Sequence, residues 1–445
     1  MAGGNVKIVI TLGPASSDIQ SITKLMSGGA EIFRLNLSHG DEDYFRKTVS
    51  AVRFVGKKLG KDFTIFFDLP GPKLRTGILP TGKLQLNKGE VYSLGPKGDI
   101  PVSIEVLRGI SLKNKILLSD GKIELKPLKK EGLNILVRAT DNAILLNKQS
   151  INSRSLSYES KYPTKKDIDG IKFGKSLGIR TFAISFPSSA KDVLSVRKVL
   201  GKDYNIIAKI ERAEAVRNFD EIAAVSDVVM VARGDLGLNI DITELPEVQR
   251  KLILRSNQLN KPVILATQVL ESMIQNPMPT RAEVNDAFSS IFEGADSLML
   301  SEETAIGLYP IRAFQMLKHV ISRFTYPSQL MPKYKIKNER DAMMDAVTDL
   351  SKKTKTDDVL LLTHSGEDAF RLSRYRAGIR IFALTDSNSI ADKLRFGRDV
   401  IPVVSDDASR LKKLTVDILK KRYGLKKAIL VNDTDGTEDI SIYKA

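Results

Sequence analysis

The sequence predicts an α/β fold, in which eight strand–helix units close into a (β/α)8 barrel, with a β-rich insertion after the third strand and a C-terminal α/β domain. Three observations predict this arrangement. Short β-branched runs alternate with amphipathic stretches of helix length, which indicates repeated βα units and a parallel sheet. Residues 73–152 break the rhythm with Gly, Pro, Lys and short alternating runs. A second alternation of strand and helix begins near Asn338.

The eight barrel strands are expected where short apolar, β-branched runs occur. These runs are Lys7–Thr11, Ile32–Leu37, Thr64–Asp68, Thr181–Ser185, Ile206–Ile210, Val228–Ala232, Val263–Thr267 and Ser297–Leu300. Helix-like segments lie between most of them. One is Ser16–Ser27, which has Ser and Asp at its start and two glycines after its end, as helix caps require.

The other two domains follow from changes in this pattern. The insertion contains alternating runs such as Lys115–Leu118 and Ile135–Thr140, which predict a small all-β domain. Tyr326–Asn338 contains two prolines and is expected to be a linker. The C-terminal strands are expected at Val359–Leu362, Ile379–Leu384 and Lys427–Val431. We therefore predict a barrel domain at 1–72 and 153–326, a lid domain at 73–152 and a C-terminal domain at 338–445.

Composition places the chain among folded globular proteins. Its 445 residues suffice for about three domains of ~150 residues, and 42% are hydrophobic and 27% charged. No apolar run approaches the ~18 residues of a membrane-spanning helix. The first residues lack the basic segment, apolar core and cleavage site of a signal peptide. We therefore expect a cytoplasmic protein without a membrane partner.

Net charge and cysteine content limit which partners and which metal ligands the chain can use. Lys and Arg exceed Asp and Glu by 69 to 53, giving a net charge of +16. Such a charge is compatible with nucleic-acid binding or with a field that attracts anionic substrates. The basic residues are scattered, without a basic tail or an RNA-binding motif, so we expect no nucleic-acid partner. The chain has no cysteine and three histidines, so any metal should be a hard cation held by carboxylates.

Polar side chains follow almost every predicted barrel strand, at the end where such barrels carry their active sites. Alternation places Arg34, Asn36 and Ser38 on one face of the second strand. Lys209 and Glu211 share a face of an otherwise apolar fifth strand. The remaining strand ends carry Asp68, Arg233-Gly234-Asp235, Thr267 and Ser301.

Each feature also has an explanation that needs no ligand. The Lys–Glu pair could be a salt bridge at the barrel end, and Gly-Asp is common in turns. Thr267 could cap a helix, His39 could be a loop histidine and Lys73 could be a solvated lysine. All of these explanations must hold together at one end of one barrel. A buried lysine, two arginines and three carboxylates would be costly there without a charged ligand.

The clustered residue types suit phosphoryl transfer, which needs positioning and charge neutralisation of the moving group. Arg34 and Lys209 supply cations, and arginine offers a fork that fits phosphate. Glu211 and Asp235 supply hard oxygen ligands for Mg²⁺. Backbone N–H groups near Gly234, if they open a helical turn, would bind a carboxylate.

Eight segments together resemble the pyruvate kinase family, and the resemblance covers almost the entire chain. They are VKIVITLGPAS, IFRLNLSHG, FDLPGPKLRTG, IIAKIERAEAVRNFDEI, VMVARGDLG, PVILATQVLESM, PTRAEVNDAF and GADSLMLSEETAIGLYP. The resemblance implies a TIM barrel, a mobile lid and a C-terminal α/β domain, assembled as a homotetramer. It also implies the glycolytic transfer of phosphate from phosphoenolpyruvate to ADP, giving pyruvate and ATP, with Mg²⁺, or Mn²⁺ as its alternative, as the metal.

The resemblance also implies a role for each site residue. Lys209 neutralises the transferring phosphoryl group and the enolate oxygen, and Arg34 contacts phosphate. Thr267, with the backbone around Gly234 and Asp235, holds the substrate carboxylate, and Thr267 and Ser301 belong to the relay that protonates the enolate. Metal binding falls to Glu211 and Asp235. The nucleotide side is formed by Pro14, Asn36, His39, Arg75 and Asp120. Glu302 departs from the family pattern, which has glycine at that position.

The resemblance further implies how the chain treats K⁺. Family members that need K⁺ hold it in a cradle that corresponds here to Asn36, Ser38, Asp68 and the backbone of Leu69. They carry glutamate where this chain has Lys73, and members with lysine there function without K⁺. We expect the Lys73 ammonium to face Asp68 and Ser38 as a compact point charge and to repel a second cation. The alternative is that Lys73 points to solvent at the lid hinge.

Two other functions remain open at this stage. The first is another barrel enzyme that acts on phosphoenolpyruvate, which would not need the lid insertion or the LRTG motif. The second is a non-catalytic sensing relative. Such a protein should have lost Lys209, Glu211, Asp235 or Thr267, and all four are present.

Overall fold

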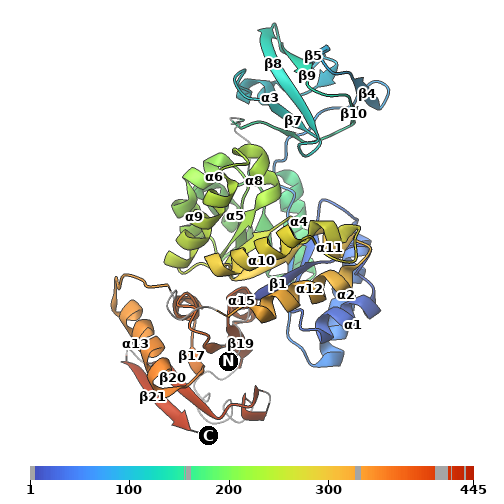
Figure 1. The fold of residues 1–445 in the computed structure, drawn as a ribbon. Coiled ribbons are helices and arrows are strands. Elements are labelled where there is room, and N and C mark those ends of the chain that lie inside the picture. Colours follow the sequence, from blue (N-terminus) through green and yellow to red (C-terminus); the bar gives the residue numbers. More distant parts are fainter. Residues whose placement is uncertain are drawn as a thin grey trace.

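The computed structural model describes residues 6–154, 156, 162–325, 332–405, 419–421, 423–434 and 437–444. Figure 1 shows a central barrel, a β-rich lid that extends from one end and a C-terminal α/β domain at the other end. Within the described part of the chain, no helix combines the length and apolarity needed to span a bilayer.

The predicted barrel is confirmed: eight parallel strands close in the order β1-β16-β15-β14-β13-β12-β3-β2. Its strands are β1 (Lys7–Thr11), β2 (Ile32–Asn36), β3 (Thr64–Asp68), β12 (Thr181–Ile184), β13 (Asn205–Ile210), β14 (Val228–Ala232), β15 (Val263–Ala266) and β16 (Ser297–Leu300). Each of them agrees with its predicted limits to within one residue. The strands are apolar apart from their ends and a few positions such as Arg34 and Lys209, because most side chains on both faces are buried, as parallel sheets require.

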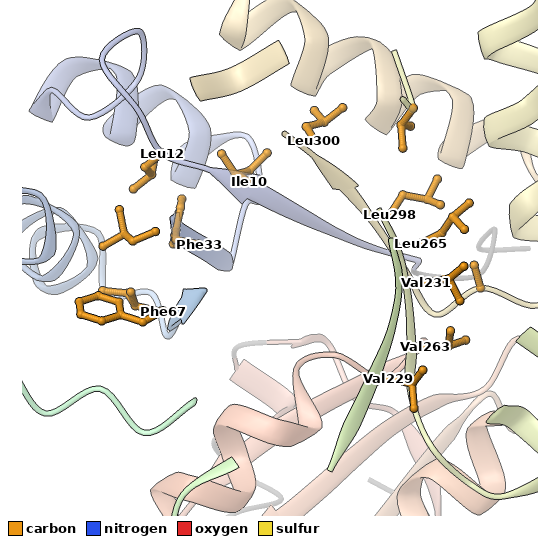
Figure 2. Packing of buried hydrophobic residues seen from close by; sticks show 14 of the residues in the cluster. Ile10, Leu12, Phe33, Phe67, Val229, Val231, Val263, Leu265, Leu298 and Leu300 are labelled. Atoms are coloured by element: carbon orange, nitrogen blue, oxygen red, sulfur yellow. The ribbon is translucent and has the colours of Figure 1, made fainter. Parts of the chain in front are cut away.

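Helices surround the barrel and cover its outer face. They are α1 (Ile19–Ser27), α2 (Glu42–Leu59), α4 (Lys165–Ser176), α5 (Ala190–Leu200), α6 (Ala213–Arg217), α7 (Phe219–Val225), α8 (Arg233–Asn239), α9 (Leu245–Gln258), η1 (Glu271–Ile274), α10 (Arg281–Glu293), α11 (Glu302–Ala305) and α12 (Pro310–Arg323). Figure 2 shows outward side chains such as Ile10, Phe33 and Leu265 in the cluster that joins strands to helices. The first helix begins three residues later than predicted, because the Asp18 carboxylate accepts the Ser21 N–H and caps it.

The insertion after β3 forms two small sheets around a separate apolar core. One sheet pairs β4 (Lys83–Leu86) with β10 (Ala143–Leu146). The other contains β5 (Val91–Gly95), β6 (Ile100–Pro101), β7 (Ile116–Leu118), β8 (Ile123–Glu131), β9 (Asn134–Ala139) and β11 (Ile151–Asn152), and α3 (Ile104–Gly109) follows β6. This confirms the predicted β-rich insertion.

The C-terminal domain is a five-stranded sheet with helices, in the order β19-β18-β17-β20-β21. Its elements are α13 (Glu339–Thr354), β17 (Asp358–Leu362), α14 (Glu367–Ser373), β18 (Arg380–Thr385), α15 (Asn388–Leu394), β19 (Val400–Val404), β20 (Lys427–Thr434) and β21 (Thr437–Lys444). The three predicted strands are present as β17, β18 and β20, whereas β19 and β21 were not predicted. Of the expected linker, residues 326–331 lie outside the described residues.

Phe396 of the C-terminal domain completes the core inside the barrel. Its ring belongs to the same buried cluster as inward-facing strand residues and lies 5.9 Å from the ring of Phe66, between centroids. The Ser297 hydroxyl donates to the Phe396 carbonyl at 2.9 Å, and Asn205 donates to the carbonyl of Ser389 at 2.8 Å. Because Ser297 and Asn205 begin their strands, the C-terminal domain closes the barrel at the end opposite the candidate site.

Phe396→Ala should therefore destabilise the whole protein, although it lies outside the barrel sequence. We expect the free energy of unfolding to fall by about 3–5 kcal/mol, since the truncation leaves a cavity in a packed core. Phe54→Ala is the matched control, because Phe54 is 55% exposed and its loss should cost under about 0.5 kcal/mol. Urea denaturation followed by circular dichroism measures both. Equal effects of the two substitutions would show that the barrel core does not depend on Phe396.

Candidate active site

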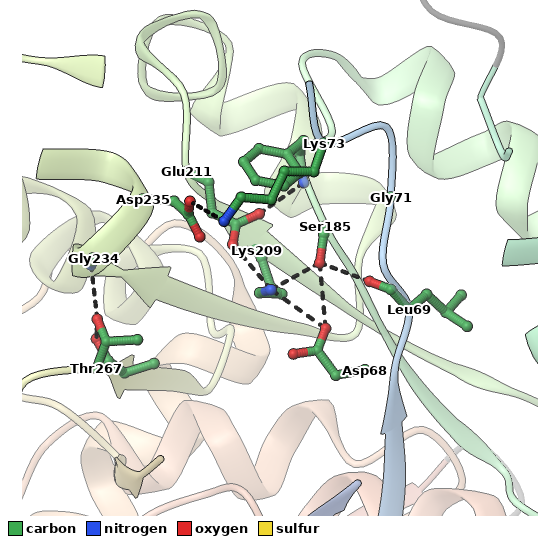
Figure 3. A network of polar contacts seen from close by, with 12 residues as sticks. Asp68, Leu69, Gly71, Lys73, Ser185, Lys209, Glu211, Gly234, Asp235 and Thr267 are labelled. Atoms are coloured by element: carbon green, nitrogen blue, oxygen red, sulfur yellow. Dashed lines mark hydrogen bonds and ion pairs between the residues drawn. The ribbon is translucent and has the colours of Figure 1, made fainter. Parts of the chain in front are cut away.

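A buried lysine lies at the centre of the polar cluster at the C-terminal end of the barrel strands. The Lys209 ammonium contacts Glu211 at 2.9 Å, Asp68 at 3.3 Å and the Ser185 hydroxyl at 2.8 Å (Figure 3). Burial disfavours its charge, but the two carboxylates outweigh that effect and raise the pKa of Lys209. Lys209 therefore remains a cation in a site that is largely shielded from water.

Asp68 balances two cations at once. Its Oδ2 accepts from Nε and Nη2 of Arg34 at 2.9 and 2.6 Å, and its Oδ1 faces Lys209. Burial opposes ionisation of this carboxyl, yet Lys209 and Arg34 hold its pKa below the usual value. The third guanidinium nitrogen of Arg34 donates to the Thr11 hydroxyl at 3.1 Å, so the Arg34 fork is fixed in the site.

Glu211 is a carboxyl whose ionisation is finely balanced. Burial raises its pKa to about 7, against the opposing charge of Lys209. Its Oε2 accepts the N–H of Phe186 at 2.8 Å. Phe186 has a φ of 62°, so the backbone turns there in the left-handed region and aims its N–H at the carboxylate. A divalent cation next to Glu211 would favour the charged form.

Lys73 does not contact the residues that the sequence analysis expected. Its ammonium lies 3.1 Å from Oδ1 of Asp235 and 3.2 Å from Oδ1 of Asp120. The expected partners were Asp68 and Ser38, but the charge of Asp68 is already balanced by Arg34 and Lys209. The correction therefore has an electrostatic reason: Asp68 already faces two cations, whereas Asp235 and Asp120 both contact the Lys73 ammonium. Together they raise the pKa of Lys73 in spite of its burial.

Glu211 and Asp235 fit a divalent cation by their chemistry. Both offer carboxylate oxygens at the same end of adjacent strands, β13 and β14, and Mg²⁺ typically takes one or two carboxylates plus substrate oxygens. The described residues contain no cluster of three or more His, Cys, Asp or Glu side chains that could hold a metal. The donor set therefore suits a metal that shares its coordination with substrate.

Thr267 lies just beyond β15, next to Gly234. The N–H of Gly234 donates to the Thr267 hydroxyl at 2.7 Å, and that hydroxyl donates to the Ala266 carbonyl at 2.6 Å. The Gly234 N–H therefore contacts Thr267, and the expected role of Gly234 in binding the substrate carboxylate stays a prediction. Thr267 leaves the strand with a φ of 69°, which is why β15 ends one residue earlier than predicted.

Ser301 lies beyond β16 and has a buried hydroxyl oxygen without a hydrogen-bond partner. Its backbone N–H donates to Oε2 of Glu303 at 2.7 Å, and Oε1 of Glu303 accepts the N–H of Leu270 at 3.1 Å. Burial raises the pKa of Glu303. This carboxyl therefore ties together the loops that carry Ser301 and Thr267. Glu302 is exposed at the start of α11, so the glycine expected there is not required.

The predicted nucleotide-side residues lie around the rim. Pro14 and His39 are exposed, and the amide oxygen of Asn36 accepts the N–H of Ser38 at 3.0 Å. Arg75 donates to the Lys148 carbonyl at 3.0 Å within the lid segment. The remaining rim residue, Asp120, is joined to the barrel side through Lys73.

The roles of four residues of the site were not predicted. They are Ser185, Phe186, Glu303 and Arg233, which hydrogen-bonds the turn after β15. Ser185 ends one of the two predicted barrel strands that were given no polar role, and its position alone could have indicated it. Its hydroxyl contacts Lys209, the Leu69 carbonyl at 2.7 Å and Asp68 at 3.3 Å. The contacts of the other three depend on loop conformations, which the residue pattern does not encode.

Comparison with known proteins covers most of the chain. Residues 4–314 match the family described as pyruvate kinase, barrel domain, and residues 341–437 match pyruvate kinase, alpha/beta domain. The sequence is 37% identical to a pyruvate kinase of Bacillus licheniformis over 87% of this chain and 70% of that protein. Identity to a pyruvate kinase of Thermotoga maritima is 34%, over 91% of this chain and 90% of that protein.

The fold agrees with these matches. A crystal structure of a pyruvate kinase from Cryptosporidium parvum has a TM-score of 0.90 and 26% sequence identity, covering 99% of this chain and 96% of that one. The closed barrel, the insertion after β3 and the C-terminal sheet are all included in that coverage. With both domains matched and the strand-end residues gathered in one site, the chain belongs to the pyruvate kinase family.

Proposed function

We infer that the chain catalyses transfer of the phosphoryl group of phosphoenolpyruvate to ADP, which gives pyruvate and ATP. The observation that carries this inference is the buried Lys209 ammonium, held between Asp68 and Glu211 at the end of the barrel that faces the lid. Another phosphoenolpyruvate-handling barrel enzyme would leave the lid unexplained. A non-catalytic sensing relative would leave this costly buried charge cluster unexplained.

A lactate dehydrogenase-coupled assay with phosphoenolpyruvate, ADP and Mg²⁺ tests the function directly. We expect turnover that requires all three components. Consumption of phosphoenolpyruvate without ADP would indicate the other barrel enzyme. A folded protein that binds phosphoenolpyruvate without turnover would indicate the sensing relative.

The site residues suggest a division of labour in which charge neutralisation dominates. Lys209 faces the transferring phosphoryl group and the developing enolate oxygen, and the Arg34 fork contacts phosphate. Thr267 orients the substrate carboxylate, with Asp235 and the backbone beside Gly234. Thr267 and Ser301 supply hydroxyls for the proton relay to the enolate carbon, which the unpartnered Ser301 hydroxyl supports.

Glu211 and Asp235 are the proposed ligands of Mg²⁺, with Mn²⁺ as a possible substitute. When bound, the divalent cation neutralises charge on the substrate oxygens during transfer. Lys73 contacts Oδ1 of Asp235, so the second carboxylate oxygen can serve the metal. The nucleotide is proposed to lie against Pro14, Asn36, His39, Arg75 and Asp120, beneath the lid.

The broader assignments remain proposals. We propose domain limits of 1–72 and 153–326 for the barrel, 73–152 for the lid and 338–445 for the C-terminal domain, which the separate apolar cores of the lid and the C-terminal domain support. We also propose a cytoplasmic homotetramer that binds neither nucleic acid nor membranes. Size-exclusion chromatography with light scattering tests the tetramer.

Independence from K⁺ is proposed on a revised physical basis. Lys73 places one positive charge between Asp235 and Asp120, beside the proposed metal and nucleotide sites. Asp68, the one carboxylate of the expected K⁺ cradle, already faces Arg34 and Lys209. A monovalent cation would therefore find its negative partners occupied, and like charges nearby would repel it.

We expect nearly equal activity in K⁺ and in tetramethylammonium at the same ionic strength. Lys73→Glu should lower kcat on the order of 10²-fold, comparable with the loss of one stabilising group, and K⁺ should restore part of it. Lys122→Glu is the control, because Lys122 is exposed in the same lid and makes the same charge reversal. Strong stimulation of the unmodified enzyme by K⁺ over tetramethylammonium would contradict the proposal.

A further inference from the structure

The backbone at Thr267 adopts a conformation that its own side chain disfavours. Thr267 and the following Gln268 have φ values of 69° and 55°, two successive residues in the left-handed region. A β-branched residue with positive φ is an outlier, since its branched side chain crowds the backbone. Such a conformation persists only where surrounding contacts hold it, and it occurs mainly at functional sites.

One buried guanidinium supplies those contacts. Nη2 of Arg233 donates to the Thr267 carbonyl at 2.9 Å and to the Gln268 carbonyl at 2.8 Å. Nε donates to the Thr267 carbonyl as well, at 3.2 Å. The carbonyls of both left-handed residues are thus bound by a single rigid fork. A lysine in its place would offer no such planar set of donors.

Arg233 is itself held from the outer helices. Its Nη1 lies 2.6 Å from Oδ2 of Asp286 in α10 and 3.4 Å from the amide oxygen of Gln249 in α9. Arg233 is 6% exposed, and Asp286 balances the charge that burial would otherwise make costly. The guanidinium therefore connects α9 and α10 to the turn after β15.

The neighbour of Arg233 acts on the same residue. The Gly234 N–H donates to the Thr267 hydroxyl, so residues 233 and 234 fix both the backbone and the hydroxyl of Thr267. We propose that Arg233 is a positioning residue, which holds the left-handed turn so that the Thr267 hydroxyl faces the substrate. It does so through the turn, without touching the substrate itself. This proposal rests on the role of Thr267 given above.

Arg233→Lys removes the planar guanidinium donors but keeps a positive charge next to Asp286. It therefore distinguishes the effect of the donors from the effect of the charge. We expect kcat to fall on the order of 10²-fold, the size expected when a reacting group is misplaced by about 1 Å. KM for ADP should change less than about twofold, since the hydrogen-bond partners of Arg233, which are Thr267, Gln268, Asp286 and Gln249, include none of the proposed nucleotide-side residues. Unchanged kcat in this variant would overturn the proposal.

A matched control distinguishes positioning from general stability. Arg376 is another buried arginine, which contacts Asp296 at 2.6 Å and the Gly294 carbonyl at 2.7 Å near the opposite end of the barrel. Arg376→Lys should lower the melting temperature by a similar amount and leave kcat unchanged. If it lowered kcat as much as Arg233→Lys does, loss of stability would explain both results and the proposal would fail.

A double-mutant cycle tests whether Arg233 acts through Thr267. Contacting groups that work as a unit are strongly non-additive. In a Thr267→Ala background, Arg233→Lys should therefore lower kcat by less than about threefold. If the fold-losses in kcat of the two substitutions multiplied in the double variant, Arg233 would act on catalysis by another route and the proposal would be overturned.

Two further measurements keep the positioning claim separate from the role of Thr267. A crystal structure of Arg233→Lys should show Thr267 relaxed to negative φ, and a retained left-handed turn would refute the claim. Added guanidinium, but not methylammonium, should partly restore the kcat of Arg233→Ala, because the variant lacks the planar set of N–H donors. If Thr267→Ala itself had normal kcat, the proposed role of Thr267 would fail while the crystal structure still decided what holds the turn.

Discussion

Lys209→Met should lower kcat on the order of 10³-fold, the upper range for loss of one preorganised electrostatic group. The substitution removes the cation that faces the developing negative charge while keeping an apolar stem of similar length. Asp68 remains paired with Arg34 at 2.6 Å, so the fold of the site should survive. Steady-state kinetics with saturating phosphoenolpyruvate and ADP provide the measurement.

Metal binding by the Lys209→Met variant distinguishes the loss of one charge from a loss of the site's structure. Glu211 and Asp235 are intact in the variant, so Mn²⁺ should still bind to it, as measured by electron paramagnetic resonance. Lys7→Met is the matched control: Lys7 is 3% exposed and contacts Glu31 at 2.6 Å, but at the start of β1, the opposite end of the barrel. It should lower stability without lowering kcat. Near-normal turnover of Lys209→Met would refute the role proposed for this lysine.

Asp235→Asn and Glu211→Gln should act on the metal instead. Each removes one of two negative charges from the proposed metal site, so the Mg²⁺ concentration for half-maximal activity should rise on the order of 10²-fold. Losses of 10–100-fold follow even when only the residues behind metal ligands are changed. Titration of activity with Mg²⁺, and of free enzyme with Mn²⁺, should show the same shift.

The control for these variants is Asp220→Asn. Asp220 is 61% exposed and pairs with Arg255 at 2.7 Å on the outer helices, so its Mg²⁺ requirement should equal that of the unmodified enzyme. If Asp235→Asn and Glu211→Gln lowered kcat at saturating Mg²⁺ with no shift in the Mg²⁺ titration, the two carboxylates would not be metal ligands.

Residue patterns by themselves determined the barrel, its interruption and the ends of its strands. Strands buried on both faces are mostly apolar. A polar residue such as Lys209 in a strand like β13 can therefore be recognised from the sequence alone. The strand ends meet because parallel strands in a barrel share their direction. That reasoning correctly gathered Arg34, Asp68, Lys209 and Glu211 before any coordinates.

Tertiary structure decided which charge meets which. Lys73 reaches Asp235 and Asp120 and not Asp68, because Asp68 is already balanced by Arg34 of β2 and Lys209 of β13. Pattern reasoning identifies the ionisable groups but cannot apportion them among partners that depend on loop paths. The left-handed backbone at Thr267 also depends on the path of a loop, so the residue pattern could not predict it.

The closing of the barrel by Phe396 was also decided only in three dimensions. Residue 396 lies in the turn that follows α15 in another domain, and nothing in its neighbourhood marks it as part of the barrel core. It nevertheless packs against Phe66 and belongs to the same buried cluster as the inward-facing strand residues. Local sequence sets the elements and the polar positions, whereas long-range packing sets their partners, since contact energies depend on which surfaces remain to be buried.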